Sequence, residues 1–241
     1  MKMGSEYAFV GMKREDAVYE AVRLMYRGYS TSLAYIGGEA NGARECVAAK
    51  NELRRLIDML GTAGRSSTIL VGLDRIGLGV DEELAFRHLE ELIREAAVYG
   101  IAITIGAEEP DRTSSVLNMY KRAANLYPSV GVTLWADSRH AEEELSGILP
   151  FSGRIRILEG EDRDSAAYLR LARKAIASGR LVSLAAVSEA IRREVRSLGL
   201  PAALNAEIEL PYGMRSELLD EARTRGDRPR VILAYGGRAM V

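Results

Sequence analysis

Carboxylate side chains gather at or just after the apolar runs of the sequence, where they could bind a cation, a polyamine or a divalent metal. The candidates are Asp137, Glu159, Glu161, Asp162, Glu207 and Glu209. Glu207 and Glu209 are two residues apart in one extended run, so they face the same side of a strand, and Glu159 could join them. The alternative, which we favour, is that Arg154 and Arg156 pair with these carboxylates in a solvated rim network. The group has no histidine and no DxD-like loop, so we predict no metal site.

Trp135 ends the apolar run GVTLW and is the single tryptophan of the chain. Its ring could cap a pocket by stacking on a ligand, or it could fill that pocket as a plug, which we favour. The two histidines, His88 and His140, have no serine or cysteine partner by sequence pattern, and Cys46 lies among apolar neighbours. We therefore predict no catalytic residue from these side chains.

The balance of acidic and basic side chains limits the classes of molecule that the protein could bind. The chain of 241 residues carries 33 basic and 34 acidic side chains, a net charge of −1. This balance argues against a dedicated binder of nucleic acid or of an anionic membrane surface. No apolar run approaches the roughly 20 residues of a membrane span, and the first residues lack an apolar segment of signal-peptide length. One cysteine excludes an internal disulfide framework, and we expect a cytoplasmic protein.

Short apolar runs alternate with longer segments of helical period throughout the chain. The runs, which we predict to be strands, span residues 30–35, 67–73, 101–106, 131–136, 154–160, 181–186, 204–210 and 230–236. The helical segments between them span residues 43–62, 81–99, 113–126, 139–147, 164–178, 188–198 and 213–225. Several of these helices stop at a glycine, the residue that ends helices without backbone strain.

Eight strands separated by helices predict parallel pairing with right-handed crossovers. We expect an α/β protein with a parallel (β/α)8 TIM-type barrel as one domain over residues 1–241, with an open doubly wound sheet as the alternative. The sequence ends five residues after the eighth run, so this barrel lacks the final C-terminal helix. An extra N-terminal helix over residues 14–26 has an apolar stripe that could fill the vacant place beside the last strand.

Five short sequence motifs follow one another along the chain in a distinctive order. They are IGGE at residues 36–39, LVGLDRIGLGV at 70–80, VGVTLWADSR at 130–139, RIRILEGED at 154–162 and AEIELPYG at 206–213. Their order and spacing resemble the flavin-dependent proline dehydrogenase family, whose motifs at these places read LGE, SxKxTxLGL, VGxxLQAYLxR, RLVKGAY and FEFQxLxG. The resemblance runs from about residue 9 to residue 236. It implies a TIM barrel with FAD that oxidises L-proline to pyrroline-5-carboxylate.

The departures from the family fall where its chemistry lies. Gly72 and Gly106 stand where the family has a lysine and an aspartate that organise flavin and proline. Trp135 replaces the flavin-contacting glutamine, and we expect it to plug the space of the flavin. Glu159 and Asp162 replace the lysine and tyrosine of VKGAY, and a lysine replaced by glutamate repels an anion.

At the remaining family positions, this sequence replaces some of the family's residues and keeps others. Ala186 and Val187 replace the Thr-His pair of the ATHD strand, Ile232 replaces the substrate-facing tyrosine, and the arginine pair that grips the proline carboxylate lies beyond the end of this sequence. The family positions for cofactor binding that remain are Arg156, Gly160 and Glu207.

These losses together predict a proline-dehydrogenase-like barrel that is catalytically degenerate, with a scaffold or regulatory role and no cofactor. One alternative is a divergent enzyme or small-ligand binder that uses the acidic barrel mouth. Another is an FAD-dependent proline dehydrogenase completed by another chain. We expect the partner to be another protein or a cationic small ligand, because an acidic rim attracts positive charge.

Overall fold

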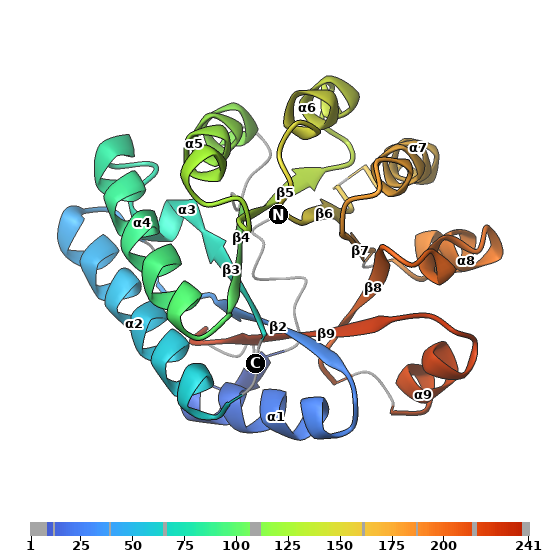
Figure 1. Ribbon diagram of the computed structural model, residues 1–241, viewed down its shortest axis with the longest axis horizontal. Coiled ribbons are helices and arrows are strands. Elements are labelled where there is room, and N and C mark those ends of the chain that lie inside the picture. Colours follow the sequence, from blue (N-terminus) through green and yellow to red (C-terminus); the bar gives the residue numbers. More distant parts are fainter. Residues whose placement is uncertain are drawn as a thin grey trace.

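The computed structural model describes residues 9–11, 13–38, 40–64, 67–106, 112–160, 162–186, 188–213 and 216–237. Eight parallel strands pair in the order β2 to β9, and β9 pairs with both β8 and β2, which closes the ring. Figure 1 shows this ring with the helices on its outside. The strands are β2 (Ser30–Tyr35), β3 (Thr68–Gly72), β4 (Ala102–Gly106), β5 (Gly131–Trp135), β6 (Ile155–Leu158), β7 (Val182–Ala185), β8 (Ala206–Pro211) and β9 (Pro229–Tyr235). The predicted (β/α)8 barrel is confirmed.

A helix follows each strand from β2 to β8 and returns the chain to the start of the next strand. These helices are α2 (Ala43–Thr62), α4 (Glu82–Val98), α5 (Thr113–Leu126), α6 (Ala141–Ile148), α7 (Ser165–Ala177), α8 (Glu189–Ser197) and α9 (Ser216–Thr224). The predicted bounds differ from these by up to three residues, because they include capping and turn residues. At the start of α4, Asp81 accepts hydrogen bonds from the backbone N–H groups of Glu83 and Leu84, as an N-cap residue does.

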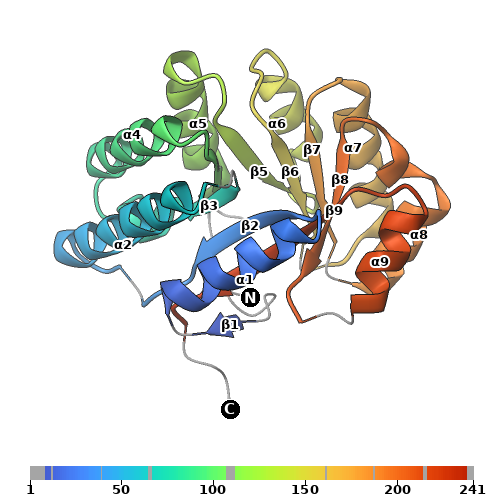
Figure 2. The ribbon, with the colours of Figure 1, turned by 60° about the horizontal axis from the view of Figure 1, so that its bottom comes forward.

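The helix α1 (Arg14–Tyr26) lies outside the barrel against β2 and β9 (Figure 2). It buries Ala17, Val18, Ala21 and Leu24 there. This placement confirms the prediction that the N-terminal helix covers the wall beside the last strand. No helix follows β9 within the described residues, which end at residue 237.

Three short elements were absent from the predictions. The strand β1 (Phe9–Gly11) pairs in parallel with the C-terminal end of β9, where Phe9 lies opposite Ala234. The others are α3 (Leu73–Ile76), directly after β3, and the 3-10 helix η3 (Leu200–Ala202), before β8. Elements of three or four residues are too short to show a hydrophobic period, so the sequence pattern does not reveal them.

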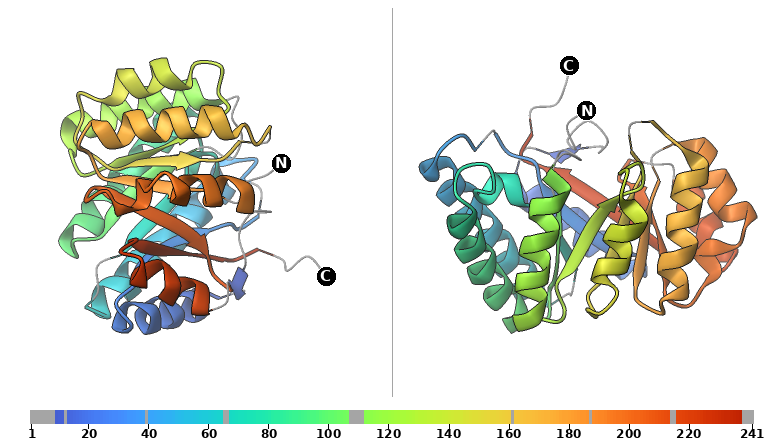
Figure 3. Two further views of the ribbon diagram at one scale, coloured as in Figure 1. Left: turned by 90° about the vertical axis from the view of Figure 1, so that its right-hand side faces the viewer. Right: turned by 90° about the horizontal axis from the view of Figure 1, so that it is seen from above.

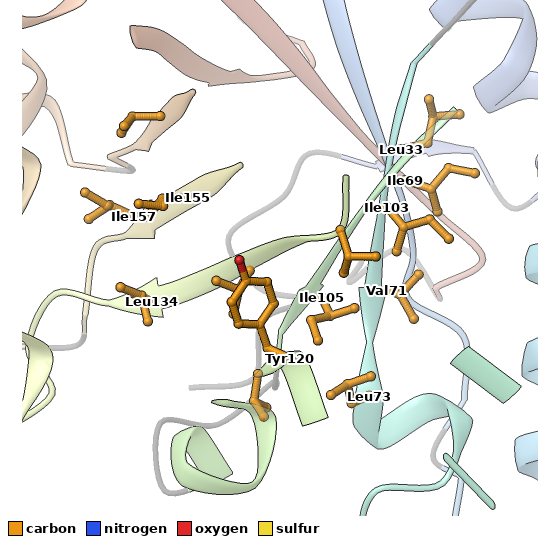
Figure 4. Close-up of a cluster of buried hydrophobic side chains, with 14 of the residues drawn as sticks. Leu33, Ile69, Val71, Leu73, Ile103, Ile105, Tyr120, Leu134, Ile155 and Ile157 are labelled. Carbon is orange, nitrogen blue, oxygen red and sulfur yellow. The ribbon is translucent and has the colours of Figure 1, made fainter. Parts of the chain in front are cut away.

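Alternate residues of each strand face the helices and form the main hydrophobic core. Figure 4 shows part of this layer, where Tyr120 of α5 lies among aliphatic strand residues such as Ile105 and Leu134. The other residues of each strand face the barrel axis. Within the described residues, no helix is both long and apolar enough to cross a membrane.

Candidate functional site

The interior of the barrel holds buried charges at two levels. At the N-terminal level, Glu207 of β8 lies between two arginines, Arg154 and Arg230, which we call the basal ion cluster. Arg154 Nη1 donates a hydrogen bond to Glu207 Oε2 at 2.5 Å, and Arg230 Nε donates to the same oxygen at 2.6 Å. Arg154 also donates to Ser183 Oγ of β7. The cluster thus joins three strands across the barrel floor.

The charges around Glu207 set its protonation. Burial alone would raise the pKa of Glu207, but hydrogen bonds and positive charge from Arg230 and Arg154 outweigh this effect and lower it. Burial and the neighbouring charge of Arg230 lower the pKa of Arg154. Glu207 is therefore an ionised counterion for two arginines at neutral pH.

A second ion pair lies one layer nearer the C-terminal end. Arg156 Nε donates to Glu209 Oε2 at 2.8 Å, and the two side chains are 2% and 3% exposed. Residues 154 and 156, like 207 and 209, are two apart on one strand, so both pairs project into the barrel. The predicted pairing of Arg154 and Arg156 with these carboxylates is confirmed, but the predicted solvated rim is wrong, because both pairs lie inside the barrel.

Trp135 is 3% exposed at the C-terminal end of β5. It packs in a small cluster with Leu158 of β6 and Ala185 of β7, apart from the main core. Three neighbouring strands thus end in apolar side chains that fill the mouth on this side. The buried position leaves no open ring face for stacking, whereas the filling of a flavin space by Trp135 stays a prediction.

Glu159 is buried at the end of β6, and its two carboxylate oxygens differ. Its Oε2 accepts a hydrogen bond from the backbone N–H of Ser188 at 2.7 Å, next to the start of α8. The positive end of a helix dipole favours a carboxylate at this place. Its Oε1 is buried without a hydrogen-bond partner among the described residues.

Asp137 follows β5 and lies against Gly160. A Cβ atom at Gly160 would fall 1.7 Å from the Asp137 carboxyl carbon, so residue 160 must be glycine for Asp137 to lie there. Asp137 Oδ1 is also buried without a partner among the described residues. Asp137 and Glu159 thus each present one unsatisfied carboxylate oxygen on neighbouring strands.

The predicted acidic mouth is therefore smaller than the sequence pattern suggested. Asp162 is exposed there, whereas Glu161 lies outside the described residues. Glu207 and Glu209 lie inside the barrel on arginine partners, and neither is at the rim as predicted. The described residues contain no group of three or more His, Cys, Asp or Glu side chains that could hold a metal ion.

Arg230 and Ser183 were missed by the sequence analysis. Arg230 sits at the start of the run RVILAYG, and a charge in a fully buried run is a signal for an interior ion pair. Ser183 has no comparable signal, because serine is common on strand surfaces.

The closed ring of eight parallel strands, with helices outside and polar side chains inside, defines a (β/α)8 TIM-type barrel. No family model matches the chain. Among curated proteins, it is similar to proline dehydrogenase 1 of Bacillus subtilis strain 168, 25% identical over 98% of this chain and 83% of the relative. It is also similar to the proline dehydrogenase of Deinococcus radiodurans, 22% identical over 95% of this chain and 80% of the relative.

Solved structures show the same fold. Proline utilization A (PutA) of Bdellovibrio bacteriovorus, in a form inactivated by N-propargylglycine, superposes with a TM-score of 0.81 at 13% identity. The PutA of Bradyrhizobium japonicum gives 0.75 at 15% identity. This chain spans about a third of the length of these PutA chains, 31% and 29%. Along nearly its whole length the chain is thus similar to proteins named proline dehydrogenase, in agreement with the resemblance found in the sequence.

Proposed function

We propose that this chain has lost the flavin-dependent reaction of its family and acts as a binding or regulatory barrel. The observation that carries the proposal is the pair of Arg156 and Glu209. Arg156 stands at a family position for cofactor binding, and here it is buried against an internal carboxylate at 2.8 Å. A buried arginine that already has a counterion is not free to serve an external ligand.

The residues around the mouth do not suit a flavin dinucleotide. Glu159 replaces a family lysine, and its buried carboxylate would repel the diphosphate. Trp135 occupies the place of the flavin-contacting glutamine and packs on Leu158 and Ala185. A cofactor would have to displace this apolar cluster and break a buried ion pair, and each change costs free energy of binding.

The test is a comparison with the B. subtilis proline dehydrogenase, purified and handled in the same way. We expect this chain to be colourless, to show no saturable fluorescence change on titration with FAD, and to reduce no dye in the presence of proline and FAD. A stoichiometric flavin spectrum or proline-dependent dye reduction would overturn the proposal. If activity appears only after addition of a cell extract, a second chain completes the enzyme and the proposal is equally wrong.

A specific observation favours a cationic ligand for the mouth. Glu159 Oε1 and Asp137 Oδ1 are buried without partners among the described residues, and an unpaired buried carboxylate oxygen destabilises the fold. An ammonium or guanidinium group that enters between the ends of β5 and β6 would satisfy them. The proposed ligand is therefore an organic cation or a basic side chain of a partner.

Agmatine, which carries both an ammonium and a guanidinium group, is a suitable probe. We expect agmatine to raise the melting temperature at constant ionic strength, and Glu159→Gln to abolish this rise. Glu143→Gln is the matched control, because Glu143 is an exposed glutamate of α6. An equal rise in the wild type and in Glu159→Gln would rule out this ligand at the mouth.

A further inference from the structure

A pocket opens at the N-terminal ends of the strands, at the opposite end of the barrel from the mouth. It has a volume of about 550 Å³, and Arg154 and Arg230 of the basal ion cluster line it. This end lies opposite β1, at the lower edge of the right-hand view in Figure 3. Thr31, Ser67, Thr68 and Ala102 are among the pocket's other lining residues. Active sites of this fold lie at the C-terminal ends of the strands, so this pocket is distinct from the mouth.

The pocket carries one uncompensated positive charge. Arg154 and Arg230 share a single carboxylate, Glu207, and the other lining residues that the structure describes include no acidic side chain. The next carboxylate along β8, Glu209, is itself paired with Arg156. Two guanidinium groups and one carboxylate leave a net charge of +1 beside the pocket.

Arg154 has hydrogen-bond donors to spare. Its Nη1 serves Glu207 and Ser183, whereas its Nε and Nη2 have no hydrogen-bond partner among the described residues. Adjacent N–H groups along one edge of a guanidinium match the two oxygens of a carboxylate. Arg230, by contrast, already donates to Glu207, to Thr31 O and to the hydroxyls of neighbouring strands.

Hydroxyl groups complete the polar wall. Thr68 Oγ1 accepts a hydrogen bond from Arg230 Nη1 at 3.1 Å, which leaves its own O–H free to donate. Ser67 Oγ donates a hydrogen bond to Thr31 O at 2.9 Å, and Thr31 Oγ1 lies 2.7 Å from Ser67 Oγ, so the hydroxyl proton of Thr31 is the one left to donate to a ligand. These groups lie on β2 and on the start of β3, on the wall of the same pocket as Arg154.

Burial and the nearby charge of Arg230 destabilise the protonated form of Arg154. Burial, and then the charge of Arg230, lower the pKa of its guanidinium. Arginine nevertheless remains protonated in proteins, so the folded state keeps the buried charge. An anion in the pocket would offset this destabilisation.

We propose that the pocket at the N-terminal end of the barrel binds the carboxylate of a small organic acid on the Nε–Nη2 edge of Arg154. One carboxylate neutralises the excess charge of the basal ion cluster, and the hydroxyls of Thr68 and Thr31 orient it. The volume admits an acid of several carbon atoms. The inference does not depend on the function of the C-terminal mouth.

The experiment measures the melting temperature in acetate, succinate and inorganic phosphate, each against chloride at equal ionic strength. We expect a saturable rise in acetate and succinate, on the order of 3 °C at tenfold excess over Kd. Arg154→Gln should abolish the rise, because it removes the binding edge and leaves Glu207 paired with Arg230. Arg173→Gln, at an exposed arginine of α7, should keep it.

A second variant covers the case in which Arg154→Gln does not fold. Ala102 lines the pocket, and Ala102→Glu would place a tethered carboxylate there. We expect this variant to show no further rise with acetate or succinate. A rise that persists in Arg154→Gln or in Ala102→Glu, or an equal effect of chloride, would overturn the proposal. A rise with phosphate alone would also overturn it, because the ligand class would then be wrong.

Discussion

At the scale of single residues, the interior of this barrel contains buried ion pairs. Arg156 with Glu209, and Glu207 with its two arginines, occupy positions where many barrels place branched aliphatic side chains. Removing each ion from water costs several kcal/mol. Only close contact between the two charges, together with further hydrogen bonds, offsets this free energy. Such pairs therefore make the fold sensitive to the loss of one partner.

The pair of Arg156 and Glu209 gives the first prediction. Arg156→Met should lower the free energy of unfolding by about 3–5 kcal/mol, because it leaves a buried carboxylate without its counterion. The double variant Arg156→Met/Glu209→Leu should recover most of that loss, since an apolar pair of similar volume needs no desolvation. Urea unfolding with unchanged m-value measures both. Equal stability of the single and double variants would contradict this prediction, because the unpaired Glu209 would then cost no stability.

The pKa of Glu207 gives a pH dependence. The folded-state pKa lies below the ordinary value of 4.5, so the stabilising effect is complete above that pH and is lost as the pH falls through the lower folded-state value. We expect Glu207→Gln to be less stable than the wild type at pH 7, with the difference shrinking below about pH 4.5. Urea midpoints measured across the pH range check this, and a difference independent of pH would contradict it.

At the scale of elements, α1 covers the barrel wall formed by β9 and β2. Its buried stripe faces β2 and β9, and its other face meets solvent. A flank without this cover would expose a wide apolar strip. The helix therefore belongs to the folding unit although it precedes the first strand of the ring.

Two residues of α1 test this role. Leu24 is 4% exposed, and Leu24→Ala should cost about 2–5 kcal/mol of stability through lost burial and the cavity left behind. Tyr19, 68% exposed on the same helix, is the matched control, and Tyr19→Ala should change stability by less than about 0.5 kcal/mol. Equal small effects of the two changes would show that α1 detaches from the barrel at little cost.

At the scale of the whole molecule, closure of the ring links the ends of the chain. β9 pairs with β8 and with β2, so neither terminal strand of the ring has a free edge. The main hydrophobic core is one continuous cluster that includes residues from α1 to β9. We expect such a ring to unfold as a unit, because opening any strand pair exposes both neighbours.

The single tryptophan reports on this cooperativity. Trp135 is buried at the end of β5, so its fluorescence follows the local barrel, whereas far-ultraviolet circular dichroism follows all helices and strands. The two signals should give coincident urea transitions. If the tryptophan signal changes at lower urea than the dichroism, the mouth opens before the rest of the barrel and the unit is not cooperative.

The amino-acid sequence by itself determined the order of the strands, the helices between them and the closed barrel. Alternation of short apolar runs with helical stripes depends on local periodicity, which any window of the chain displays. The same holds for the place of α1, whose apolar stripe needs a wall to cover. The motif order from residue 9 to residue 236 indicated a resemblance to proline dehydrogenases, and the similarity to curated proline dehydrogenases confirmed this resemblance.

The sequence pattern predicted that Arg154 and Arg156 pair with carboxylates, but only the tertiary structure decided which carboxylate each arginine meets and that the pairs are buried. Glu207 and Glu209 are acidic residues at strand spacing, and the sequence pattern placed them on a solvated rim. The barrel turns both inward onto arginines of other strands, more than 20 residues away in the chain. Pairing over such separations depends on the register and tilt of the closed ring, which no local pattern encodes. The unsatisfied oxygens of Glu159 and Asp137 and the pocket beside Arg154 exist for the same reason.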